Sequence, residues 1–242
     1  MNSLVNVSSR LVLARELLWA GTDDRALRRA AERGHAVRII PGVYLSVDLW
    51  NSLGDDERYL LRVVAVAGNA RSSVICSHYS AAALQGYPII GTWPTQVHII
   101  VGSASGQRSS PVVTRHAVDV DEDELVECDG FLMTNPLRTV CDIARVASTA
   151  TAVATLDRAL APPATTNRNV EPRATVFGAA ADTTPSGPPL DRQEVLDALA
   201  RLGPVRGVRQ ALFAAGFADG ASGSPGESFS RLQVHRLHLP KP

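Results

Sequence analysis

A long stretch rich in proline, glycine, serine and threonine divides this chain and limits how its parts can fold. From Pro162 to Pro189 there are 28 residues, of which 6 are Pro, 2 are Gly and 6 are Ser or Thr. This composition has too few large apolar side chains to offset the conformational entropy that is lost on ordering. We therefore expect a disordered linker over residues 162–189, between folded units and further helices.

The chain as a whole has the composition of a folded, soluble protein. Hydrophobic residues make up 45% and charged residues 20% of the 242, which excludes a collagen-like, coiled-coil or fully disordered chain. The 24 basic residues cancel the 24 acidic ones, so any attraction to nucleic acid must be local. No signal peptide or membrane span is recognisable, and three cysteines without a C-x-x-C pair fit a reduced cytoplasm.

The periodicity predicts an α+β fold whose first unit is a winged helix-turn-helix at residues 1–52. Leucines at near-helical spacing predict a helix from Leu11 to Gly21, and Thr22 caps a second helix from Asp23 to Arg33. The runs before and after Pro41-Gly42 predict a β-hairpin. Two helices at a tight turn followed by a hairpin have the arrangement of a winged helix.

A second, mixed α/β unit is expected at residues 53–161. Helices are predicted over 57–70 and 77–84, after Pro136, and over 150–160. Strands are predicted over 96–101 and 112–116, together with a strand pair, 125–127 and 131–134, that turns at Asp129-Gly130. A helical segment follows the linker at 190–218. Residues 219–242 contain a last candidate helix from Glu227, but as a whole they are expected to be disordered.

The second helix of the first unit carries the candidate DNA contacts. Its apolar residues share one face, and its arginines point away from that face. The predicted DNA-binding residues are Arg25, Arg28, Arg29, Arg33 and Arg38. Asp23 and Asp24 in the first turn would repel phosphate, and the segment from Gly21 to Val47 nets only +2, so a merely solvated helix face is the alternative.

A second charged segment is acidic. Seven Asp or Glu and no Lys or Arg lie between His116 and Phe131. This pattern is typical of a solvated loop, but Asp121, Glu122, Asp123 and Glu124 are also a candidate docking surface for a basic partner. That partner is either the nucleic-acid-facing side of another protein or the arginine helix of a second copy.

Other groups favour structural roles, and no catalytic or metal-binding residue is predicted. Ser77 and His78 are adjacent on a helix and point about 100° apart, so a capping serine beside a packed histidine is expected. Cys76 lies in an apolar run and is expected in the core. His98 and His116 alternate with apolar residues on adjacent strands and can approach one another, but no third metal ligand is evident.

Several motifs in order resemble the AbiEi-like antitoxin and transcriptional regulator proteins of actinobacteria. They are Leu17–Gly21, Arg25–Arg29, Val37–Tyr44, Ser77–Gly86 and Asn135–Asp142. The resemblance covers roughly residues 11–161, and residues 190–218 more loosely; the linker departs from the family pattern. It implies an N-terminal winged helix-turn-helix that binds operator DNA and a following domain that acts as an antitoxin beside a nucleotidyltransferase-like toxin.

Many relatives in that family carry a further domain similar to very-short-patch-repair endonucleases, announced by a segment like Ser224–Ser228. Glu227 would be the first Mg²⁺ ligand of such a domain, but no Asp or Glu occurs among Ser228–Pro242. We therefore expect a non-enzymatic, cytoplasmic DNA-binding regulator. The alternatives are an inactive remnant of an endonuclease and a protein-interaction module that does not bind DNA.

Overall fold

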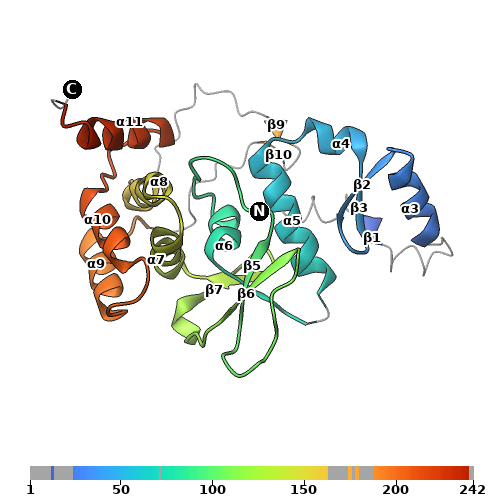
Figure 1. Cartoon of the computed structure of the whole chain (residues 1–242), viewed down its shortest axis with the longest axis horizontal. Coiled ribbons are helices and arrows are strands. Elements are labelled where there is room, and N and C mark those ends of the chain that lie inside the picture. Colours follow the sequence, from blue (N-terminus) through green and yellow to red (C-terminus); the bar gives the residue numbers. More distant parts are fainter. Residues whose placement is uncertain are drawn as a thin grey trace.

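A computed structural model describes residues 12–13, 24–70, 72–162, 174–175, 178–179 and 188–239. The chain is α+β, as expected. In Figure 1 the N-terminal helix α3 and its small sheet lie at one end, a larger sheet occupies the middle, and the C-terminal helices lie at the other end.

The N-terminal part is a helix followed by a β-hairpin. Helix α3 (Asp24–Glu32) leads into β2 (Ala36–Ile40) and β3 (Val43–Ser46), an antiparallel pair that turns at Pro41-Gly42 as predicted. Gly42 has φ +83, a conformation that favours glycine. Strand β1 (Val12–Leu13) pairs with β3, so the helix predicted from Leu11 is wrong at these two residues; the rest of that predicted helix lies outside the described residues.

The hairpin shares its core with the next unit. Helix α4 (Val47–Ser52), which was not predicted, joins it to the long helix α5 (Asp55–Asn69). Ile39, Val43 and Leu45 are buried in one cluster with Leu61 and Val64 of α5. The predicted boundary at residue 52 therefore separates segments that pack together.

The central sheet has the strand order β6-β5-β4-β8-β7. Its strands are β4 (Ile75–Cys76), β5 (Val97–Val101), β6 (Val113–Ala117), β7 (Leu125–Cys128) and β8 (Phe131–Thr134). The pairs β5–β6 and β4–β8 are parallel, whereas β4–β5 and β7–β8 are antiparallel. The sequence pattern missed β4, because a strand of two residues has no detectable alternation.

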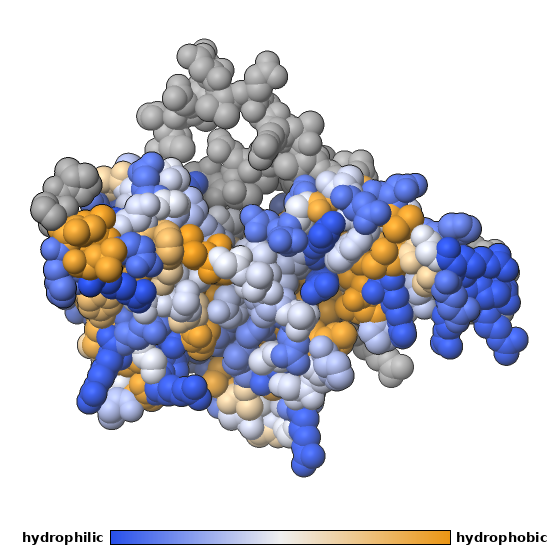
Figure 2. Space-filling view, turned by 45° about the horizontal axis from the view of Figure 1, so that its top comes forward, coloured by the Kyte–Doolittle hydropathy of each residue, from blue (hydrophilic) through white to orange (hydrophobic). Residues whose placement is uncertain are grey.

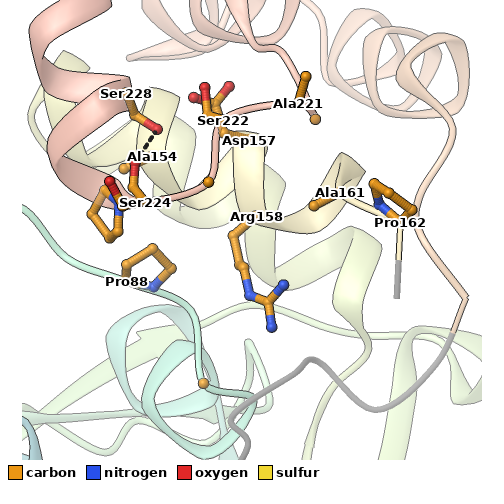
Figure 3. A pocket seen from close by; sticks show the side chains of 14 residues that line it. Pro88, Ala154, Asp157, Arg158, Ala161, Pro162, Ala221, Ser222, Ser224 and Ser228 are labelled. Carbon is orange, nitrogen blue, oxygen red and sulfur yellow. Dashed lines mark hydrogen bonds between the residues drawn. The ribbon is translucent and has the colours of Figure 1, made fainter. Parts of the chain in front are cut away.

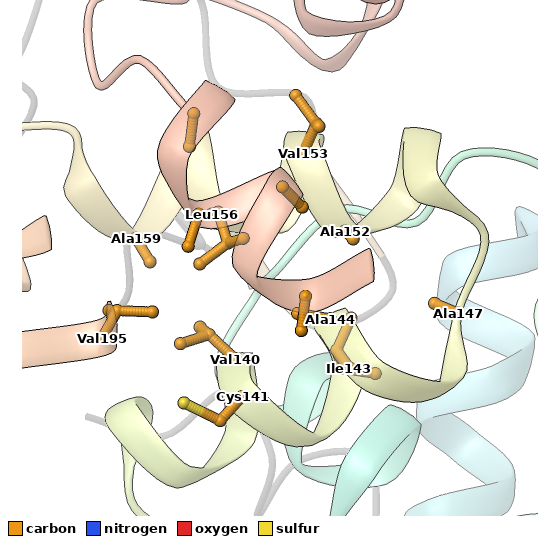
Figure 4. Packing of buried hydrophobic residues seen from close by; sticks show 14 of the residues in the cluster. Val140, Cys141, Ile143, Ala144, Ala147, Ala152, Val153, Leu156, Ala159 and Val195 are labelled. Atoms are coloured by element: carbon orange, nitrogen blue, oxygen red, sulfur yellow. The ribbon is translucent and has the colours of Figure 1, made fainter. Parts of the chain in front are cut away.

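The C-terminal helices form a second core with the end of the α/β unit (Figure 4). They are α7 (Pro136–Val146), α8 (Thr149–Leu160), α9 (Arg192–Arg201), α10 (Val208–Phe217) and α11 (Pro225–Arg236). Val140, Leu156, Leu199 and Leu232 are each fully buried there. The expectation that residues 219–242 are disordered is therefore wrong for α11, because Leu232 gains a buried site against α8. The candidate helix expected from Glu227 is confirmed, and it begins two residues earlier, at Pro225.

Within the predicted linker the structure describes a short antiparallel pair, β9 (Ala174–Thr175) and β10 (Gly178–Ala179). The prediction of disorder is wrong at these four residues, and the others between 163 and 187 lie outside the described part. Leu190, at its end, donates its backbone N–H to Ala159 O at 2.9 Å. In the described part of the chain, no helix has the length and apolar character needed to cross a bilayer.

Candidate nucleic-acid interface

Helix α3 has two chemically different faces. Ala26, Leu27, Ala30 and Ala31 are half-buried, as their spacing predicted. Arg25, Arg28, Arg29 and Arg33 are all exposed, and so is Arg38 on β2. The helix therefore turns its small apolar side chains inward and its guanidinium groups toward solvent.

This helix lies at an end of the molecule where a large ligand can reach it. Figure 1 shows α3 on the outer side of the small sheet, with α5 beyond the opposite side. Hydrophilic residues gather over the same end in Figure 2. No ion pair within the described residues engages Arg29, Arg33 or Arg38.

The hairpin is held firmly behind α3. Asn69, the last residue of α5, donates from its side-chain amide to Pro41 O at 3.4 Å. On α4, the helix that follows the hairpin, the Trp50 ring lies against α5: the guanidinium groups of Arg58 and Arg62 are 5.1 and 5.8 Å from its centre. The hairpin tip is thus tied to α5, and α3 with Arg38 remains the accessible basic surface.

The acidic candidates are only partly available as a docking surface. Asp121, Glu122 and Asp123 are exposed, at and within the short 3₁₀ helix η1 (Glu122–Glu124). Glu124 is different, because both of its carboxylate oxygens accept from Arg138 Nη1 at 2.8 and 2.9 Å. Glu124 therefore ties η1 to α7 and is the least available of the four acidic residues.

Three histidines form a compact cluster beneath the start of helix α6 (His78–Leu84). His98 Nδ1 and His116 Nε2 are 3.0 Å apart, so the predicted approach of these two side chains is confirmed. His78 stacks on His116 with ring centres 3.7 Å apart and an angle of 8° between the planes. Burial, together with the neighbouring His116, lowers the pKa of His98 to about 4 and that of His78 to about 2.

The cluster lacks the geometry of a catalytic triad or a three-histidine metal site. In a triad the two imidazole nitrogens contact the serine and the acid separately. Here the single atom His78 Nδ1 contacts both Ser77 Oγ at 3.1 Å and Asp142 Oδ2 at 3.8 Å. The stacked rings of His78 and His116 direct their lone pairs into parallel planes, so these cannot converge on one ion. Among the described residues, no three His, Cys, Asp or Glu side chains are grouped so that they could hold a metal ion.

Sequence reasoning missed the network that surrounds this cluster. Asp142, only 2% exposed, accepts from Arg138 Nε at 3.0 Å and lies 3.5 Å from Arg145 Nη1. Arg138 and Asp142 have the i, i+4 spacing at which an ion pair forms on a helix, whereas no local spacing indicates the link onward to Glu124. His78 also has φ +49, which is uncommon for a residue with a side chain. No local pattern distinguished His78 from an ordinary helical residue.

A cavity of 690 Å³ lies between α8 and the loop that precedes α11 (Figure 3). Its most buried charge, Asp157, is committed to the protein: it accepts from Arg231 Nη2 at 2.6 and 2.8 Å and from Asp219 N. Glu227, the residue proposed as a first metal ligand, accepts from Gly223 N at 2.8 Å and fixes the start of α11. Both carboxylates therefore act as structural groups.

Cys76 is 1% exposed and burial raises the pKa of its thiol to about 12, which confirms it as a core residue.

No protein-family model matches this chain, and no curated protein matches it. Among solved structures, it is similar to the crystal structure of the RV2827C protein from Mycobacterium tuberculosis. The two are 15% identical, the match covers 96% of this chain and 80% of that chain, and the TM-score is 0.45. Function is therefore inferred from the residues of this chain.

Proposed function

We propose that this chain is a DNA-binding transcriptional regulator of the antitoxin type, without enzymatic activity, acting in the cytoplasm. In this proposal residues 1–52 form a winged helix-turn-helix in which α3 enters the major groove of double-stranded operator DNA. The observation that carries it is the polarity of α3: small apolar residues face the hairpin, and four exposed arginines face outward at the end of the molecule.

Electrostatics supports this role for the arginine face. Each arginine that neutralises a phosphate releases counterions, so the binding constant falls with salt at a slope of about −0.9 per contact. Arginine also fits the O6 and N7 edge of guanine with two hydrogen bonds. Arg25, near the start of α3, is assigned to base edges, and Arg28, Arg29, Arg33 and Arg38 to the backbone.

The proposal includes a protein partner, a toxin that this chain would counteract. The exposed acidic residues Asp121, Glu122 and Asp123 are suited to a basic surface such as that of a nucleotidyltransferase-like toxin. A reading frame for such a toxin is expected next to this gene. Co-purification of the two products would support the antitoxin role, and loss of the complex in an Asp121→Lys, Asp123→Lys variant would locate the contact.

DNA binding is tested by titrating the protein against its own upstream region at two salt concentrations. The wild type should bind this region more tightly than an unrelated duplex. Replacing Arg29 and Arg33 by alanine should weaken binding about tenfold or more and reduce the salt slope by about 2. The matched control, Arg108→Ala with Arg236→Ala, removes two exposed arginines elsewhere and should bind as the wild type. If the DNA shows no change in mobility with added protein at low salt, DNA binding is refuted, and the alternative of a protein-interaction module is favoured.

A further inference from the structure

A second exposed basic surface lies far from α3, at the loop between α9 and α10. Arg201, Arg206 and Arg209 are exposed there, and none of them forms an ion pair with another described residue. Aliphatic side chains accompany them: Leu202 is 37% exposed and Val205 43%. We call this loop, residues 201–209, the basic corner.

The basic corner is rigidly attached to the C-terminal end of α7. Gly207, at φ +85, packs so closely on the Arg145 carbonyl that a side chain would not fit. Gln210 donates to Ala144 O at 3.1 Å and to Ala147 O at 2.8 Å. Val146, at the end of α7, is 49% exposed and extends the apolar part of the surface.

The N-terminal end of α7 holds the opposite charge. Exposed Asp121, Glu122 and Asp123 form what we call the acidic corner. It is also rigid, because Asn135 donates to Asp123 O at 2.8 Å and Arg138 binds Glu124. The neighbouring strand β7 is an edge of the sheet, and its Val126 is 37% exposed.

The two corners are attached to opposite ends of α7. Arg138 and Arg145 are two helical turns apart, and both pair with buried Asp142. Eleven residues of helix separate the corners by roughly 16 Å, too far for them to pair within one chain.

We propose that this surface joins two copies of the chain as an antiparallel dimer. A twofold axis near Asp142 brings the basic corner of each copy onto the acidic corner of the other, because a surface with opposite charges at its two ends is complementary to itself after such a rotation. The exposed side chains of Val126, Val146, Leu202 and Val205 are then covered.

A second copy fits this surface better than nucleic acid does. The acidic corner would repel a phosphate backbone, and phosphate contacts do not use aliphatic side chains. The dimer does not depend on the DNA-binding proposal, since α3 and Arg38 are not part of this surface. It competes with the proposed toxin contact, because both use Asp121, Glu122 and Asp123.

Sedimentation velocity on the full chain tests whether the dimer forms. Dimers are expected at low salt at concentrations up to about 100 µM, with at least about tenfold weaker association in about 0.5 M NaCl, because exposed charge pairs are screened. A monomer at every concentration in low salt would overturn the proposal.

Charge reversal locates the contact. One variant reverses the basic corner (Arg206→Glu, Arg209→Glu) and another the acidic corner (Glu122→Arg, Asp123→Arg). Each alone should be monomeric, since like charges then meet at both contacts. An equal mixture should form a heterodimer about as stable as the wild-type dimer, because every contact again joins opposite charges. Native mass spectrometry distinguishes this heterodimer by mass.

The control variant Arg108→Glu, Arg236→Glu changes the net charge by the same amount as reversal of the basic corner, but away from α7, and should dimerise as the wild type. The proposal is overturned if either corner variant dimerises normally, or if the mixture stays monomeric while circular dichroism shows both variants folded.

Discussion

Asp142 is a buried carboxylate held between two arginines. Its carboxylate is 2% exposed, and burial raises its pKa, while the charges of Arg138 and Arg145 act in the opposite direction. A buried carboxylate that loses its partner becomes an uncompensated charge, which is costly. Removing Arg138 is therefore expected to cost more stability than the attraction between the two charges contributes, because it leaves the buried Asp142 carboxylate poorly compensated.

We expect Arg138→Met to lower the free energy of unfolding by about 2–4 kcal/mol, since Arg145 alone remains near Asp142. Urea denaturation measures this loss. The double variant Arg138→Met, Asp142→Asn removes the orphaned charge and should recover part of the stability. If the double variant is no more stable than the single one, burial of an unpaired carboxylate is not the cause.

The histidine cluster predicts acid sensitivity. The folded-state pKa values of His98 and His78, about 4 and about 2, lie below the ordinary value of 6.5, and that of His116 is also lowered. The unfolded chain therefore binds protons first as pH falls, so stability is complete above about pH 6.5 and decreases below it. Between pH 7 and 5 we expect a loss of roughly 2–4 kcal/mol.

Urea denaturation at the two pH values tests this expectation, and His98→Gln should reduce the pH dependence. An equal slope in the variant would assign the acid sensitivity to other groups.

At the scale of elements, replacing two glycines of the C-terminal helices by alanine is expected to change the stability of the protein in opposite directions. Gly207 begins α10 at positive φ against the Arg145 carbonyl, whereas a Cβ at Gly216 within α10 would meet no atom within 4 Å. Gly207→Ala should destabilise the protein by about 2 kcal/mol or more, and Gly216→Ala should stabilise it by up to about 1 kcal/mol. Thermal denaturation of both variants distinguishes a local clash from a general effect of alanine.

At the scale of the whole molecule, the two cores meet at helix α6. Ala81 belongs to the core with α5, its neighbour Ala82 to the core of the C-terminal helices, and Tyr79 packs against both. The predicted domains at 53–161 and 190–218 thus share packing rather than being joined only by a linker. Helix α11 belongs to the same structure through Leu232 and through Arg231, which binds Asp157 on α8.

This shared packing predicts unfolding as one cooperative unit. Leu232→Ala should cost about 2–4 kcal/mol, and exposed Phe229→Ala less than about 0.5 kcal/mol. Every tryptophan lies before residue 94, so tryptophan fluorescence reports on the other core. A shift of that fluorescence transition in Leu232→Ala is expected; an unchanged transition would show that the two cores unfold separately.

Local sequence was sufficient for features that depend on residues a few positions apart. The opposite faces of α3, the turn at Pro41-Gly42, the strand pair around Asp129-Gly130 and the helices of the α/β unit all follow from periodicity and turn chemistry. The same information predicted that His98 and His116 approach one another, because they lie on adjacent strands.

Tertiary structure alone decided which of these groups are buried and which are available. The sequence does not distinguish Glu124 from its exposed neighbours. What distinguishes it is a tertiary contact, its pairing with Arg138 fourteen positions later. Asp157 and Arg231 are 74 positions apart, and the docking of α11 depends on their contact. Burial and ion pairing depend on what the rest of the chain brings to a residue, and contacts between distant positions leave no periodicity in the sequence.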